Sequence, residues 1–342
     1  MRGDPAIFGD TTEPPVNLLC STPATATTTP LKWRREMIET NDYNHLRAFL
    51  TQRSIQTLMF YSTLVRDPHT AMWLEEFGGE EHHLFNKFHG TTGMNHHTWD
   101  GYIQELLSHE DQELIISTRR RGPGMGGWSK SNPYLKPRFN ENKISLSPRG
   151  LAVRLLSIRE QIASEFVSDL DLIRSQEKSI WESRRMLMAD KSQDRDQVTF
   201  VRMGVSILSQ SLPEGSTPLR VGAYDLLTLM STHDAVLNIL KNLRENGNAD
   251  NNEYVFLLGF YEERLHFFEG SGIYGRADDF LEELIKAEAT INTTDGSVLD
   301  PLRLAKLLLT ERNAVCDAYS EICSNIEEDH LELRRTLLEL NL

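Results

Sequence analysis

The sequence predicts an all-α protein, a multi-helix bundle built around two long helices at about 148–190 and 300–340. The strongest observation is a ladder of apolar residues near the C-terminus, which recur on alternating steps of three and four. This spacing places one apolar stripe, here called the seam, along one face of a helix, and the seam requires an apolar partner surface. Only Arg312 and His330 interrupt it. Its apolar members are Leu302, Ala305, Leu309, Cys316, Tyr319, Cys323, Ile326, Leu333, Leu337 and Leu340.

The second observation is a stretch without Gly or Pro that follows Ser147-Pro148, apart from Gly150 near its start. Its apolar residues recur with a period near 3.6, which favours a fairly straight bundle helix. Those residues are Leu151, Leu155, Ile158, Ile162, Phe166, Leu170, Ile173 and Ile180. Further helices are expected near 221–246, 252–269 and 276–290, because Gly-rich turns separate apolar periodic segments there. Asp300-Pro301 is a typical start signal for the last helix.

The N-terminal part divides into a disordered tail, residues 1–31, and a helical subdomain, residues 32–118. Two helices are expected within 33–66, with Asp42 capping the second. Asp67-Pro68 predicts another helix start, and a further helix is expected near 98–118. The bundle proper is predicted to occupy residues 148–342.

Residues 119–147 are predicted to form a long, basic, Gly- and Pro-rich loop or linker. The segment 119–154 holds nine Lys or Arg residues and one acid, Glu141, so its local charge is +8. Taking +8 from the total of −14 leaves the rest of the chain at −22. Loops of this length are usually functional. We expect it to bind a partner with negative charge, either an acidic protein or the acidic body of this chain. The candidate residues are Arg119, Arg120, Arg121, Lys130, Lys136 and Arg138.

Contact between residues 119–139 and single-stranded RNA is an alternative, because Trp128, Tyr134 and Phe139 offer stacking surfaces among the positive charges. The acidic remainder of the chain argues against broad nucleic-acid binding.

The three cysteines include no CxxC pair, which suggests a reducing compartment. With no apolar run of the length that spans a bilayer, membrane insertion is not expected. We expect a cytoplasmic location, with an organelle stroma or matrix as the alternative.

Histidine and glutamate pairs raise a second alternative, a metal site for iron or zinc. Five of the eleven histidines lie between 82 and 97, next to Glu80 and Glu81. Di-iron bundles use two E-x-x-H motifs on facing helices, with further glutamates from two other helices. The chain offers three such spacings, but no fourth carboxylate ligand is evident. The candidate ligands are Glu80, His82, His83, Glu263, His266, Glu327 and His330.

The sequence therefore favours a non-enzymatic helical protein that serves protein–protein interaction, scaffolding or assembly. The long amphipathic helices offer extended faces, and a homodimer is one way to cover such a face. The alternatives are a metal-dependent, ferritin-like helical enzyme with non-haem iron, and an RNA-contacting accessory protein. No cofactor is expected under the first interpretation, and no nucleophile motif is present.

Overall fold

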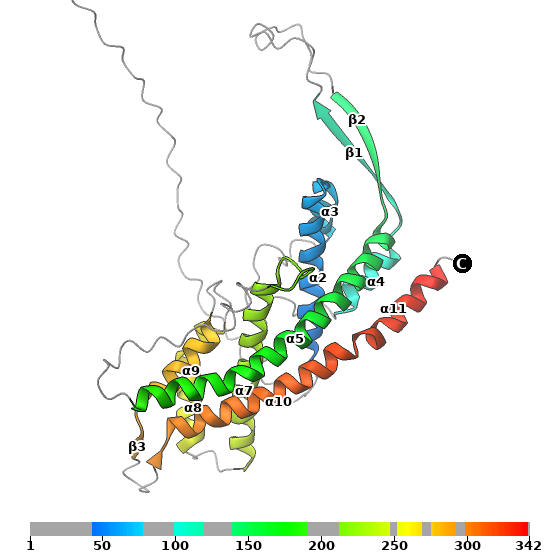
Figure 1. Cartoon of the computed structure of the whole chain (residues 1–342). Coiled ribbons are helices and arrows are strands. Elements are labelled where there is room, and N and C mark those ends of the chain that lie inside the picture. Colours follow the sequence, from blue (N-terminus) through cyan, green and yellow to red (C-terminus); the bar gives the residue numbers. More distant parts are fainter. Residues whose placement is uncertain are drawn as a thin grey trace, which may run out of the picture. The chain divides into compact units, whose positions relative to one another are not determined.

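The protein was analysed as a computed structural model, and the described part of the chain is predominantly helical, as the sequence predicts (Figure 1). The described residues are 43–77, 99–119, 139–189, 212–246, 252–268, 275–291 and 298–340. They belong to one compact unit that spans Asp42–Leu342. The predicted tail at 1–31 lies outside them, and the predicted domain boundaries at 118 and 147 stay a prediction. No helix among the described residues is long and apolar enough to cross a membrane.

The first helices are short and begin close to the signals read from the sequence. Helix α2 runs Asn44–Leu64 after Tyr43, so the predicted cap Asp42 lies just outside the described residues. Helix α3 runs Pro68–Phe77, and the Asp67 carboxylate accepts hydrogen bonds from the Thr70 N–H (3.2 Å) and hydroxyl (2.6 Å). Asp67 is therefore the predicted cap.

The bundle is formed by longer helices that pack along one another. Helix α5, Pro148–Ala189, is one continuous helix of 42 residues. Helix α10 packs along α5 and α7, and α2 packs on α5 (Figure 1). Helices α7 (Arg220–Asn246), α8 (Asn252–Glu263) and α9 (Arg276–Lys286) follow, with a 3₁₀ turn, η4 (Leu265–Phe267), between the last two.

The predicted single helix at 300–340 is two helices, α10 (Pro301–Ser324) and α11 (Ile326–Leu340), separated at Asn325. Asp300 caps α10 as predicted, since its side chain accepts a hydrogen bond from the Leu302 N–H (3.0 Å). From Ala305 to Leu333 every position of the seam is buried, so the seam faces the core across the break. Cys316 and Cys323 are free and buried.

The largest departure from the prediction is a β-hairpin. Helix α4 covers only Gly101–Ser108, and the strand β1 (Gln112–Arg119) occupies the rest of the predicted helix 98–118. Strand β2 (Phe139–Leu146) occupies the end of the predicted loop 119–147 and pairs antiparallel with β1. Strands β3 (Thr290–Ile291) and β4 (Val298–Leu299) form a separate short pair.

One hydrophobic cluster joins the N-terminal helices to the bundle. It includes buried residues of α2, α3, α4, β2, α5 and α11, among them Leu74, Ile103, Leu155 and Leu333. The base of the hairpin enters this cluster through Leu146, so the hairpin grows directly out of the core.

Candidate functional site

The β1–β2 hairpin, here called the arm, extends away from the helices (Figure 1). Each strand has eight residues, and the register runs from Gln112 opposite Leu146 at the base to Arg119 opposite Phe139. Within the described part of the chain the two strands pair only with each other. Each strand therefore has one outer edge whose backbone groups lack a strand partner there, which is the arrangement that recruits a further strand.

The base of the arm is fixed to the helices by polar and apolar contacts. The Trp73 indole N–H donates a hydrogen bond to the side-chain oxygen of Gln112 (2.9 Å). Leu146 is 4% exposed in the core cluster, and Leu114 packs against that cluster. An isolated two-stranded hairpin is at best marginally stable in water, so these contacts are what hold the arm in place.

The two faces of the arm differ in composition. Because side chains alternate along a strand, Leu114, Ile116, Ile144 and Leu146 share one face, here called the apolar face. The apolar face is buried at the base of the arm and becomes exposed further out, since Leu146 is buried whereas Ile144 is 38% exposed. On the other face Ile115 is 63% exposed, and Lys143 pairs with Glu113 at 2.9 Å. The outer arm thus presents apolar side chains to solvent.

The structure places only one of the predicted anion-binding residues. Arg119 is the last residue of β1, at the outer end of the described arm. The other five, Arg120, Arg121, Lys130, Lys136 and Arg138, lie outside the described residues, between the two strands in sequence. The predicted basic segment 119–147 therefore begins at the last residue of β1 and includes β2.

The candidate metal ligands do not form a site among the described residues. No group of three or more His, Cys, Asp or Glu side chains that could hold a metal ion occurs there. Glu263 ends α8 and accepts a hydrogen bond from Arg264 (3.0 Å), while His266 is exposed in η4. The helix expected near 252–269 ends at Glu263, so Glu263 and His266 lie on different elements. Glu80, His82 and His83 lie outside the described residues.

The second pair is on one helix, but its histidine is already bonded on both ring nitrogens. Glu327 is exposed in the first turn of α11, whereas His330 is fully buried. Arg159 donates from Nη1 to His330 Nε2 (2.6 Å), and His330 Nδ1 lies 2.8 Å from Glu160 Oε1. The Arg159 guanidinium also lies over the Trp99 ring, 4.2 Å from its centroid. These contacts connect α5 to α11 and leave neither nitrogen of His330 for a metal.

A buried triad that the sequence did not reveal joins three helices. Asp234 of α7 accepts hydrogen bonds from the Tyr319 hydroxyl (2.6 Å) and from His45 Nε2, which lies 2.9 Å away. Burial acts to raise the pKa of Asp234, but His45 and the Tyr319 hydroxyl outweigh it and hold that pKa below its ordinary value. Burial beside this carboxylate raises the pKa of Tyr319 well above its ordinary value. The triad therefore acts as a fixed link between α2, α7 and α10.

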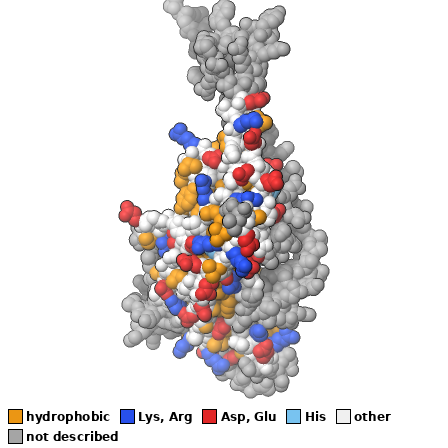
Figure 2. Space-filling view, turned by 90° about the vertical axis from the view of Figure 1, so that its right-hand side faces the viewer, with side chains coloured by type: hydrophobic (Ala, Val, Ile, Leu, Met, Phe, Trp, Pro, Cys, Tyr) orange, Lys and Arg blue, Asp and Glu red, His pale blue; other side chains and the backbone are white. Residues whose placement is uncertain are grey.

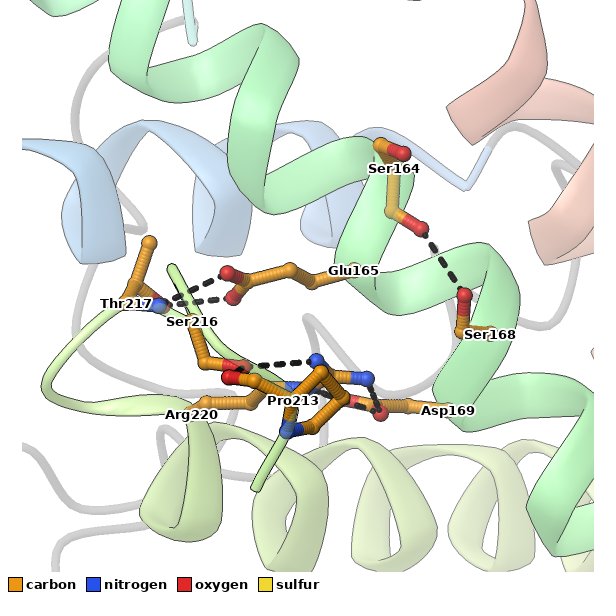
Figure 3. A network of polar contacts seen from close by, with 8 residues as sticks. All are labelled: Ser164, Glu165, Ser168, Asp169, Pro213, Ser216, Thr217 and Arg220. Carbon is orange, nitrogen blue, oxygen red and sulfur yellow. Dashed lines mark hydrogen bonds and ion pairs between the residues drawn. The ribbon is translucent and has the colours of Figure 1, made fainter.

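Figure 3 shows a further network, in which the turn before α7 is fastened to α5. Arg220 donates to both carboxylate oxygens of Asp169, and the closest contact is 2.7 Å. One turn earlier on α5, Glu165 accepts hydrogen bonds from the N–H and hydroxyl of Thr217. Burial raises the pKa of Asp169, and Arg220 opposes that rise. The contact is an intramolecular ion pair and serves the fold.

Arg312, which interrupts the seam, is also completely buried on α10. None of its three guanidinium nitrogens has a hydrogen-bond partner in the part of the chain that the structure describes. Burial of a charged group without partners is costly. Arg312 is therefore a buried charged residue of the bundle core.

Figure 2 shows hydrophobic, basic and acidic side chains interspersed on one face of the molecule. Comparisons with known protein families, with characterised proteins and with solved structures found no match for this chain.

Proposed function

We propose that the chain is a non-enzymatic interaction and assembly protein that uses the arm to bind another protein molecule. The observation that carries this proposal is the arm itself, fixed to the core at its base and uncovered beyond it. Its outer part combines strand edges without a partner among the described residues and exposed Ile115 and Ile144. A strand added to such an edge gains a ladder of backbone hydrogen bonds, and exposed side chains on the arm supply specificity.

The rest of the described chain supports this proposal by its rigidity. The titratable groups with buried positions, such as Asp169, Asp234 and His330, are engaged in contacts between helices. A rigid base restricts the conformations of the arm before binding, and pre-organisation of this kind favours association.

The metal-dependent enzyme and the RNA-contacting protein remain the alternatives. Stoichiometric iron or zinc in the purified protein, lost on substitution of His82, His83 or His266, would favour the enzyme. Retention on a polyanion column that weakens steeply with salt would favour RNA contact through residues 119–139.

A photo-crosslinking amino acid at position 144 tests the proposal directly. We expect irradiation to yield a discrete protein adduct, since Ile144 lies on β2 and is 38% exposed. The matched control is position 255 on α8, where Val255 is 57% exposed, and no discrete adduct is expected there. The absence of an adduct at 144, or equal adducts at both positions, would refute the proposed function.

A further inference from the structure

We infer that the partner of the arm is a second copy of this chain, bound by antiparallel pairing of β2 with β2 of that copy. This inference rests on the proposed function and names its partner. It would place the strands in the order β1, β2, β2, β1 across a two-fold axis. The same surface is then used by both copies, as in an isologous dimer.

The outer edge of β2 carries charges in an order that complements itself. Charged residues usually protect a strand edge from pairing, and β2 has two in its centre, Glu141 and Lys143. They have opposite signs and lie two residues apart, on the same face of the strand. If Asn142 lies on the two-fold axis, Glu141 of each copy stands opposite Lys143 of the other. Both charged positions then meet an opposite charge, which is favourable for directly opposed residues.

The same register places the apolar faces of the two arms on one side of the sheet. With Asn142 on the axis, Ile144 of one copy stands opposite Asn140 of the other, and both are even-numbered positions of β2. In the arm the even-numbered positions of both strands share one face with Leu114 and Ile116. The apolar side chains of the two arms therefore lie on the same side of the four-stranded sheet, with Asn142 of each copy between them. A register shifted by one residue would place the apolar face of one copy beside the polar face of the other.

The helical bodies leave room for this pairing. The two β2 strands run in opposite directions, so the two arm bases lie at opposite ends of the sheet. Leu146 lies four residues from the axis in each copy, so the two bases are separated by eight residues, which is about 27 Å along the strands at 3.4 Å per residue. The arm also extends away from the helices (Figure 1).

The outer edge of β1 is less suited to define a register. Its opposite charges, Glu113 and Arg119, are six residues apart. In a two-fold pairing of β1 they would meet only near the strand ends, where pairing frays. Glu141 and Lys143 flank the axis directly, so β2 specifies its register at the centre.

Two single charge reversals and their mixture test this inference by sedimentation velocity. Either single reversal, Glu141→Lys or Lys143→Glu, places two like charges opposite each other at both 141–143 contacts across the axis. We therefore expect the dimerisation constant of each variant to be roughly tenfold weaker than that of the wild type. An equimolar mixture of the two variants should recover wild-type dimerisation, because each reversed position then faces an opposite charge in the other variant. The double variant E141K/K143E should also dimerise like the wild type.

A matched control separates this effect from the ion pair within the arm. Glu113→Gln removes the Lys143–Glu113 pair inside one copy but changes nothing on the proposed axis, so its dimerisation should stay at the wild-type level. Circular dichroism of each variant checks that the helical body is folded.

Any one of three results would overturn the inference. The first is a wild type that stays monomeric up to high concentration. The second is single reversals that dimerise like the wild type, and the third is a mixture of the two variants that does not recover dimerisation. If the chain is monomeric but the crosslinker at 144 captures a different protein, the inference fails and the proposed function stands. If the chain is monomeric and no adduct forms, both fail; binding to a polyanion alone would instead favour RNA contact.

Discussion

At the scale of single residues, His330 shows how a polar side chain is accommodated in the seam. Arg159 has only N–H groups to donate, so His330 Nε2 is the acceptor and carries no proton. The ring proton is therefore on Nδ1, from which it is donated to Glu160. Burial lowers the pKa of His330, and the hydrogen bond to Glu160 opposes this without offsetting it. Burial also lowers the pKa of Arg159, to about 10.

We predict that His330 makes the protein less stable as the pH falls from about 7 to about 5. The pKa of His330 is lower in the folded state than the ordinary value near 6.5, so the unfolded chain binds the extra proton first. The stabilisation is thus fully present above the unfolded pKa and is lost as the pH falls below it. His330→Gln should flatten this part of the profile of unfolding free energy, measured by urea denaturation.

The control for this prediction is His266→Gln. His266 is exposed in η4, and its substitution should leave the pH profile unchanged. An unchanged profile in His330→Gln as well would show that His330 does not titrate as described.

The sequence predicted the burial of the seam correctly from Ala305 to Leu333, but not at Leu340, which is 40% exposed, and it did not predict the role of the polar members. Apolar spacing located the buried positions of α10 and α11 because a helix repeats every 3.6 residues. The same spacing holds for Arg159 and Asp169, which lie on the buried stripe of α5. On α5, a charged residue on the apolar stripe therefore marks a buried polar contact with another helix. Its partners, His330 and Arg220, lie far along the chain, and local patterns do not reveal them.

At the scale of elements, helices were predictable where local signals determine them. Asp67 and Asp300 begin helices because their carboxylates accept backbone N–H groups within a few residues. The strand at 112–119 was missed because its short apolar run fits either period. What makes it a strand is the pairing with β2, whose nearest residue is 20 positions further along the chain. The β-branched Ile115, Ile116 and Thr118 were the available hint.

The link between Arg220 and Asp169 should be important for the placement of α7 on α5. We predict that Arg220→Met lowers the free energy of unfolding by about 3–5 kcal/mol, since it leaves the buried Asp169 carboxylate without its cation. Chemical denaturation followed by circular dichroism measures this change.

A matched control substitution is available on the surface of α5, the helix that carries Asp169. Arg174 pairs with Asp171 and Asp317, which are largely exposed, and Arg174→Met should cost less than about 1 kcal/mol. Equal losses for the two substitutions would contradict the account of the buried pair.

At the scale of the whole molecule, a helical body presents one arm, and charge opposes close approach of two copies. The net charge of −14 on each chain is repulsive at low ionic strength. Pairing of the arms must therefore depend on short-range strand contacts. The sequence pointed to residues 119–147 as functional because of their length, Gly content and charge. It did not reveal that the segment begins and ends in paired strands, since that follows from contacts between distant residues.

The most direct test of the account is a disulfide at the proposed two-fold axis. In a chain with Cys20→Ser, the substitution Asn142→Cys places two thiols opposite each other, at a Cα separation of about 4.5–5.5 Å that a disulfide spans. The remaining cysteines, Cys316 and Cys323, are buried. Mild oxidation should convert this variant to a covalent dimer of twice the 39.1 kDa chain mass.

The control Ile144→Cys should not crosslink, because position 144 of one copy faces position 140 of the other and the two cysteines are therefore four residues apart. No dimer at 142, equal yields at both positions, or crosslinking through Ile116→Cys instead would contradict the account.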